Sequence, residues 1–118
     1  MKTEFDVKWV ALLLDQIETN LGITKPIGLE VLIEEVEAMA NVEAIAGASS
    51  RLEALIYGVG DYSASQGINP DVFKKDHGYP GDVWHYGRMK SSIAARMHGI
   101  YFIDGPYPNI KDPEGYAV

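Results

Sequence analysis

The sequence of 118 residues contains no cysteine and only 6 prolines. Without cysteine, the chain has no disulfides, no thiolate metal ligands and no cysteine nucleophile. No apolar run approaches the roughly 20 residues that a membrane-spanning helix needs. Residues 1–10 carry acids where a signal peptide would have a basic stretch followed by an apolar one. We therefore expect a cytoplasmic protein with no membrane partner.

Positive charge is also scarce, with 10 Lys and Arg against 17 Asp and Glu and a net charge of −7. This balance argues against a nucleic-acid partner or an anionic membrane surface. The 47% of hydrophobic and 23% of charged residues are typical of a chain that folds around a core. The length fits one segment, 1–118, but a whole (β/α)8 barrel needs about 250 residues and at least about 200.

Helical and strand-like patterns alternate along the chain. Thr3 and Asp6 have the spacing of a capping box, and Gly22 is a plausible helix stop. Short helices that alternate with short apolar strands predict right-handed crossovers and a parallel sheet, which is an α/β fold. The expected elements are a helix over 5–21, a strand over 27–33, a short helix over 42–46, a strand over 53–57, a helix between its N-cap Asp82 and its stop Gly99, a strand over 100–103 and a helix starting at Asp112 and Pro113. Residues 58–61 are expected to form a turn and 62–81 an irregular connection.

Several features favour structural roles. The stripe formed by Met89, Ile93 and Met97 is expected to face the core, because its i, i+4, i+8 spacing is helical. Trp84 and Tyr86 fit either packing or an interface. The glycines and serines of 58–65 lack the Gly-Lys-Ser/Thr ending of a phosphate loop. The histidines have no metal-ligand spacing and are expected at the surface or in packing; they are His77, His85 and His98.

An acid follows each of the three expected strands. These acids are Glu34 or Glu35, Asp61 and Asp104. Function collects at the carboxyl ends of parallel strands, and neighbouring strands lie roughly 4.8 Å apart, so these carboxylates could share one ion. Oxygen ligands favour Mg²⁺ or Mn²⁺. The alternative stays open, since Asp and Glu after a strand often cap a helix or lie in a solvated turn.

Longer segments resemble a known family. Residues 32–35 (Leu-Ile-Glu-Glu), 41–46 (Asn-Val-Glu-Ala-Ile-Ala) and 51–65 (Arg-Leu-Glu-Ala-Leu-Ile-Tyr-Gly-Val-Gly-Asp-Tyr-Ser-Ala-Ser) resemble the CoA-ester lyases of the citrate lyase β-subunit-like family. The later segments resemble its malyl-CoA / β-methylmalyl-CoA lyase branch. They are 81–86 (Gly-Asp-Val-Trp-His-Tyr), 103–107 (Ile-Asp-Gly-Pro-Tyr) and 111–116 (Lys-Asp-Pro-Glu-Gly-Tyr), and all segments occur in the family's order.

The resemblance implies a (β/α)8 barrel that assembles into oligomers and makes or breaks a carbon–carbon bond beside a CoA thioester. The reaction it implies is cleavage of a malyl-CoA-type ester to acetyl-CoA or propionyl-CoA plus glyoxylate, with citryl-CoA cleavage as the alternative. It implies that Glu34 and Asp61 bind Mg²⁺ or Mn²⁺. It also implies that the backbone amides of Gly60 and Asp61 bind the carboxylate of the keto acid. The segment expected along the thioester is Ile103, Asp104, Gly105 and Pro106.

The resemblance covers only the middle of the barrel, about three of its eight strands. No segment matches the arginine on the family's early strands, the groups that hold the CoA nucleotide, or the acid that its C-terminal region contributes. The catalytic residues are therefore not assigned. We expect a homo-oligomer or a complementing chain, and a non-catalytic interaction protein remains an alternative. A receiver-like signalling domain is disfavoured, because the last strand ends at Asp104 and no fifth strand follows.

Overall fold

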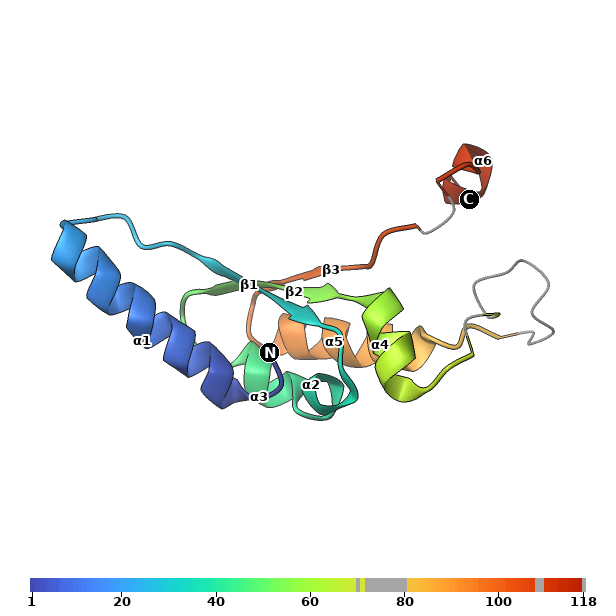
Figure 1. Cartoon of the computed structure of the whole chain (residues 1–118), viewed down its shortest axis with the longest axis horizontal. Coiled ribbons are helices and arrows are strands. Elements are labelled where there is room, and N and C mark those ends of the chain that lie inside the picture. The colour runs from blue at the N-terminus through green and yellow to red at the C-terminus, as the bar shows by residue number, and fades with distance from the viewer. Residues whose placement is uncertain (70, 72–80, 108–109, 118) are drawn as a thin grey trace.

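The computed structural model describes residues 1–69, 71, 81–107 and 110–117. Three strands form a parallel sheet in the order β1-β2-β3, and helices connect them (Figure 1). This confirms the expected α/β class. The elements are α1 (Glu4–Leu21), β1 (Leu29–Ile33), α2 (Val36–Ala40), α3 (Val42–Ala46), β2 (Leu52–Tyr57), α4 (Val59–Gln66), α5 (His85–Met97), β3 (Tyr101–Ile103) and α6 (Pro113–Tyr116).

Local chemistry sets the ends of the longer helices. At the start of α1, the carboxylate of Asp6 accepts the backbone N–H of Thr3 at 2.9 Å. Gly22 ends α1 with φ at +68°, and Gly99 follows α5 with φ at +70°, a region that glycine adopts without strain. Asp112 accepts the N–H of Gly115 at 3.0 Å and caps α6. These expected helix ends are confirmed.

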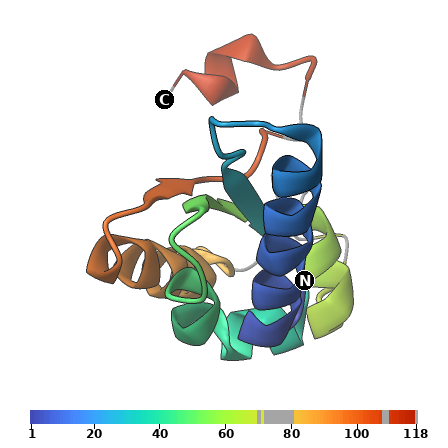
Figure 2. The same cartoon turned by 90° about the vertical axis from the view of Figure 1, so that its left-hand side faces the viewer.

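The helices α1 to α5 lie on one face of the sheet, whereas α6 lies apart from them (Figures 1 and 2). Alternate side chains of a strand point to opposite faces, so Val31 and Ile33 of β1 and Leu55 and Tyr57 of β2 lie under the helices, at most 1% exposed. Their helical partners are buried residues of α1, α3 and α5. These partners include Val7, Val42, Ile45, Ala94 and Ala95.

The opposite face of the sheet is open. The strand register aligns Leu32, Ile56 and Ile103 in one row across this face. Leu32 is 46% and Ile103 41% exposed, and Tyr101 at the edge is 78% exposed. Parallel sheets are normally covered on both faces. In the described residues, helices cover one face of the sheet, and the other face lacks the cover that parallel sheets normally have.

The residues of α5 that face the core differ from those expected. Met89, Ile93 and Met97 are 45%, 60% and 66% exposed, so their assignment to the core was wrong. Small residues face the sheet instead, because α5 packs too closely for long side chains: a Cβ placed at Gly87 would lie 2.7 Å from Tyr57 Oη. The buried residues of α5 are Gly87, Ser91, Ala94 and Ala95.

Two short helices were not expected. The segment 58–61, expected as a turn, holds the N-cap Gly58 and the start of α4, which continues through residues 62–66 that were expected to be irregular. The helix α2 begins at Val36, and two residues separate it from the end of β1. Asp82 is not the N-cap of α5, which begins at His85; instead its carboxylate accepts the N–H of Trp84 at 2.9 Å. His77 and most of the connection between α4 and α5 lie outside the described residues.

The molecule is elongated, with a radius of gyration of 16.6 Å and extents of 54 × 29 × 23 Å. A compact chain of this length would have a radius of gyration of about 13.5 Å. The outer side of α1 is apolar and exposed, with Phe5 at 69%, Trp9 at 57% and Leu12 at 58%. Among the described residues, no helix has the length and apolar character needed to cross a membrane.

Candidate metal and substrate site

The three acids that follow the strands lie at the carboxyl edge of the sheet. Glu34 comes directly after β1, Asp61 lies in the first turn of α4 after β2, and Asp104 comes directly after β3. The strand ends are aligned, since Ile33 pairs with Tyr57 in the β1–β2 register. The topology thus brings all three acids to one edge.

Glu34 lies against the turn that leads to Asp61. The N–H of Gly58 donates to the carbonyl of Ile33 at 3.0 Å, which joins the ends of β1 and β2. A Cβ placed at Gly58 would lie 2.6 Å from Glu34 Cβ and 3.3 Å from Glu34 Oε2. The Glu34 side chain therefore crosses the position that only glycine leaves open, and Gly58 is the N-cap of the helix that carries Asp61.

A second hydrogen bond holds α4 to the segment after Glu34. Ser65 Oγ accepts the backbone N–H of Val36 at 3.0 Å. Glu34 is half-buried, whereas Asp61 and Gly60 are exposed. The two carboxylates are thus carried by segments that two hydrogen bonds tie together.

Ion pairs distinguish Glu34 from the acids beside it. Lys2 forms ion pairs with Glu35 and Glu37, which raise the pKa of Lys2, mainly through the hydrogen bond to Glu35. Neither Glu34 nor Asp61 has an ion-pair partner among the residues that the structure describes. Of the two acids that directly follow β1, Glu34 is the one without a cation partner.

Asp104 differs from the other two strand-end acids, because Arg88 holds it. Arg88 Nε donates to Asp104 Oδ1 at 3.1 Å and to Oδ2 at 3.0 Å, and its Nη1 pairs with Asp82. The side chain of Arg88 is 29% exposed. The Arg88 guanidinium neutralises the Asp104 carboxylate, which therefore does not resemble a free metal ligand.

The segment after β3 passes close to the end of β2. A Cβ placed at Gly105 would lie 2.7 Å from the carbonyl oxygen of Tyr57 and 3.0 Å from Val59 Cγ1. Glycine is required there for this approach. Residues 103–106 and the turn 58–61 are thus neighbours, as a shared substrate site would need.

The donor set fits a hard cation. Mg²⁺ is usually bound through one or two carboxylates, with water and substrate oxygens completing its shell. Within the described part of the chain, no group of three or more His, Cys, Asp or Glu residues is arranged around a metal position. Glu34 and Asp61 therefore suit Mg²⁺ or Mn²⁺ with open positions better than a closed site made by the protein alone.

The other sequence candidates have structural roles. His85 and His98 are exposed at the two ends of α5, and a Cβ at Gly47 would lie 2.5 Å from His98 Cε1, so His98 packs on Gly47. The hydroxyl of Ser63 donates to the carbonyl of Val59 at 2.6 Å. Trp84 packs against the core, whereas Tyr86 is 67% exposed.

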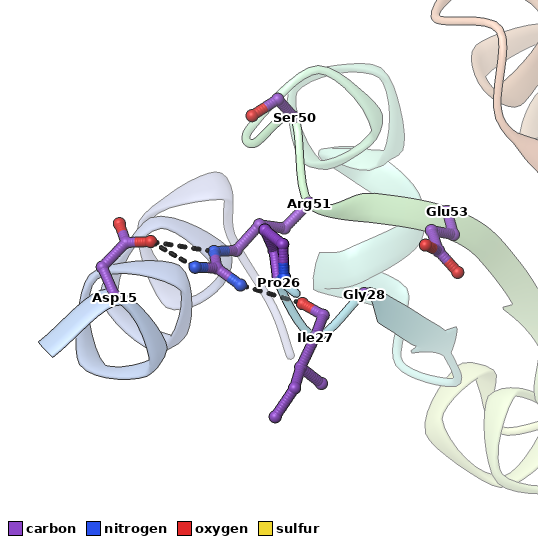
Figure 3. A pocket seen from close by; sticks show the side chains of 7 residues that line it. All are labelled: Asp15, Pro26, Ile27, Gly28, Ser50, Arg51 and Glu53. Atoms are coloured by element: carbon purple, nitrogen blue, oxygen red, sulfur yellow. Dashed lines mark hydrogen bonds and ion pairs between the residues drawn. The ribbon is translucent and has the colours of Figure 1, made fainter. Parts of the chain in front are cut away.

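A separate hollow lies at the amino-terminal edge of the sheet (Figure 3). Arg51 forms ion pairs with Asp15 and Glu18 of α1 and donates to the carbonyl of Ile27 at 3.0 Å. Ile27 in turn donates its N–H to Glu18 Oε1 at 2.7 Å. The hydrogen bond from Arg51 lowers the pKa of Glu18. Each of these charges is compensated internally, so the cluster joins α1 to the starts of β1 and β2.

Sequence reasoning missed Arg88 and the contacts that Ser63 and Ser65 make. Arg88 and Asp104 are 16 positions apart and lie on different elements, so no periodicity links them. A serine that donates to the carbonyl four residues earlier, as Ser63 does, leaves no distinctive sequence pattern.

Comparisons with known proteins agree with the resemblance. The family model "HpcH/HpaI aldolase/citrate lyase" matches residues 1–118. The chain is 36% identical to an L-malyl-CoA/β-methylmalyl-CoA lyase of Cereibacter sphaeroides over 96% of its own length and 39% of that protein. It is 30% identical to a malyl-CoA/β-methylmalyl-CoA/citramalyl-CoA lyase of Chloroflexus aurantiacus, over 92% and 36% of the two chains. It thus spans well under half of the curated relatives.

Solved structures show the same architecture. A citrate lyase from Burkholderia xenovorans superposes with a TM-score of 0.82 at 19% identity, covering 95% of this chain and 35% of that one. A Haloferax volcanii malate synthase in a pyruvate/acetyl-CoA complex gives 0.82 at 23% identity, with 98% and 31% covered. The fold is a partial (β/α)8 barrel with three parallel strands, and the chain belongs to the HpcH/HpaI aldolase/citrate lyase family.

Proposed function

We propose that this chain contributes the divalent-metal site and part of the thioester site of a carbon–carbon lyase. The substrate is a 3-hydroxyacyl-CoA of the malyl-CoA type, and the products are acetyl-CoA or propionyl-CoA plus glyoxylate. The observation that carries this proposal is the pair Glu34 and Asp61: both follow neighbouring strands, and neither has a cation partner among the described residues. The relatives named as malyl-CoA lyases support the choice of substrate.

Glu34 and Asp61 supply the two anionic oxygens of the metal site. A bound Mg²⁺ or Mn²⁺ lowers the pKa of the substrate hydroxyl and polarises the carbonyl in the direction of condensation. In cleavage, the hydroxyl loses its proton, the carbon–carbon bond breaks, and its electron pair passes to the thioester as an enolate that then takes up a proton. Two carboxylates leave room on the ion for the hydroxyl and carboxylate of the substrate.

The first turn of α4 holds the keto acid. The N–H groups of the first helical residues have no partner within the helix and attract anions. Gly60 and Asp61 lie in that turn, and both residues are exposed. Their amides are thus available to the carboxylate of a glyoxylate-like acid. Residues 103–106 take the thioester beside it, because Gly105 lies against the end of β2.

The open sheet face supports a proposal about assembly. The row of Leu32, Ile56 and Ile103 faces away from the helices, and Glu30 and Glu53 have no ion-pair partner among the described residues. We propose that further βα units, in a homo-oligomer or a complementing chain, cover this face.

Proton transfer is assigned to no residue of this chain. A cytoplasmic location and the assignment of 1–118 to the centre of the barrel stay predictions.

Binding of Mn²⁺, followed by electron paramagnetic resonance, tests the metal site. Glu34→Gln and Asp61→Asn should each weaken binding by about tenfold or more, since each removes one of two anionic ligands. Glu35→Gln is the matched control, because its carboxylate pairs with Lys2. Wild-type affinity in Glu34→Gln would refute the site.

Turnover distinguishes the remaining alternatives. The chain is incubated with Mg²⁺ and either malyl-CoA or citryl-CoA, and release of acetyl-CoA is measured. Faster release from malyl-CoA supports the proposal, whereas faster release from citryl-CoA favours citrate lyase chemistry. Metal binding without turnover of either ester is the result expected of a chain that carries only part of the site, whereas robust turnover by this chain alone would show that it needs no further residues.

A further inference from the structure

Arg88 connects Asp104, which lies in the candidate site, to Asp82, which precedes α5. It lies in α5 and uses Nε for both carboxylate oxygens of Asp104, at 3.0 and 3.1 Å, while Nη1 pairs with Asp82. One carboxylate precedes α5 and the other follows β3. A planar guanidinium can bind two carboxylates in this way, whereas the single ammonium of lysine is a point charge.

The contacts continue from Arg88 to α4. The Arg88 guanidinium carbon lies 5.8 Å from the centre of the Trp84 ring, which is within the range of a cation–π interaction. Trp84 Nε1 donates to Ser63 Oγ at 2.8 Å, and Ser63 is only 2% exposed. Ser63 Oγ donates to the carbonyl of Val59 at 2.6 Å, beside Gly60.

The loop after β3 is fixed from its other side by packing. Gly105 lies so close to β2 that a Cβ there would be 2.7 Å from the Tyr57 carbonyl oxygen. The N–H of Gly105 also donates to Asp104 Oδ1 at 2.8 Å. The direction of the Asp104 side chain, which Arg88 sets, and the path of the loop backbone are therefore linked.

We propose that Arg88 is a positioning residue for the acyl-CoA thioester. It acts through Asp104, holding residues 104–106 against the first turn of α4 so that the thioester and the keto acid meet in a fixed arrangement. The inference rests on the proposed function. The metal carboxylates are also held by two hydrogen bonds that do not involve Arg88, Gly58–Ile33 and Val36–Ser65, so we expect them to stay in place when Arg88 is changed.

The test measures acetyl-CoA by calorimetry and Mn²⁺ by paramagnetic resonance on the same variants of the chain. Arg88→Met should weaken acetyl-CoA binding by about tenfold. Its Mn²⁺ affinity should stay within about twofold of the wild type, because additivity holds for contacts that share no partner. Arg88→Lys should recover part of the loss, because it restores the charge without the fork. Asp82→Asn keeps the Arg88–Asp104 pair and should bind acetyl-CoA like the wild type.

The pair itself is tested with a double-mutant cycle. Asp104→Asn should weaken acetyl-CoA binding as much as Arg88→Met, and the double variant should be no weaker than either, because both changes break one contact. Additive losses, wild-type acetyl-CoA affinity in Arg88→Met, or an equal loss of Mn²⁺ affinity would each overturn the inference. A wild-type chain that binds Mn²⁺ but no acetyl-CoA overturns it while the metal site stands, and one that binds neither overturns the proposed function itself.

Discussion

Alanine at position 58 is expected to disturb Glu34 without touching the Glu34 residue itself. The φ of Gly58 is −82°, outside the left-handed region that favours glycine, so the change does not place alanine at a positive φ. It introduces only a methyl group, and that methyl would lie 2.6 Å from Glu34 Cβ. The consequences therefore report on where Glu34 lies.

The size of the effect follows from that distance. Carbon atoms in ordinary contact are about 3.5–4.0 Å apart, so the two atoms must separate by about 1 Å. Rotation about χ1 does not move Cβ, and Glu34 Cα is itself only 3.5 Å from the new methyl, so the end of β1 has to shift. Overpacking of this kind costs about 1–3 kcal/mol. A displacement of about 1 Å at a ligand can cost about 10²-fold in function.

The assay combines urea denaturation with Mn²⁺ binding. Gly60→Ala is the matched control: it lies in the helix that Gly58 caps, and apart from its chain neighbours and its own helix backbone no heavy atom of the described residues lies within 4 Å of its new methyl. It should leave the free energy of unfolding within about 1 kcal/mol of the wild type, because alanine in a helix is favoured over glycine by about 0.5–1 kcal/mol. Its Mn²⁺ affinity should not change. If Gly58→Ala binds Mn²⁺ as the wild type does, Glu34 is not a ligand in the arrangement described.

Three further changes test the packing and the charges. Tyr57→Phe should raise the free energy of unfolding in urea by about 1–3 kcal/mol, since Tyr57 Oη is buried without a hydrogen-bond partner among the described residues. Tyr101→Phe, at an exposed position, is the control and should change this free energy little. A less stable Tyr57→Phe variant would show that the hydroxyl has a hydrogen-bond partner. Arg51 lowers the pKa of Glu18 in the folded protein below its ordinary 4.5, so the ionised Glu18 stabilises the fold at pH values above 4.5. This stabilisation is lost as the pH falls through the lowered pKa of the folded state. Urea midpoints of Glu18→Gln should therefore fall less steeply with acidity than those of the wild type, and parallel curves would contradict this. Ile93→Glu should change the free energy of unfolding in urea by about 0.5 kcal/mol or less, because Ile93 is 60% exposed; a large loss of stability would show that Ile93 is core.

Local chemistry made part of the fold predictable. The Thr3–Asp6 spacing and Gly22 mark the ends of α1, and Gly99 marks the end of α5, because caps act over a few residues. The helix α4 was missed because Gly60 and the serines Ser63 and Ser65 are poor helix formers. Contacts distant in sequence stabilise it instead, including the hydrogen bond from Trp84 to Ser63. Tertiary packing overrides propensity there.

The buried face of α5 was predicted wrongly for a related reason. Large side chains at helical spacing usually mark the core side of a helix. Here the helix lies so close to Tyr57 that only small residues fit, and Met97 and its neighbours in the stripe point away from the sheet. Hydrophobic periodicity gives the existence of a helix but not how closely it packs.

The site could be predicted as far as the strand ends. An acid after each strand was visible in the sequence, since parallel topology brings strand ends to one edge. What the sequence did not contain was the pairing of those acids with cations. Lys2 forms an ion pair with Glu35, 33 positions away, and Arg88 forms one with Asp104, 16 positions away. Of the acids that follow the strands, only the folded arrangement leaves Glu34 and Asp61 without an ion-pair partner among the described residues.

The open face bears on how tightly this site can bind. Asp61 is exposed and Glu34 half-buried, so water screens both carboxylates from a cation between them. The row of Leu32, Ile56 and Ile103 lies on the open face of the sheet, next to the carboxyl edge that carries these two acids. A cover over that row would exclude water from the edge as well, and charges interact more strongly where the dielectric constant is lower. The Mn²⁺ affinity of this chain alone is therefore a lower bound for the Mn²⁺ affinity of an assembly in which the face is covered. If a βα partner that buries the row left that affinity unchanged, the open face and the metal site would be independent of each other.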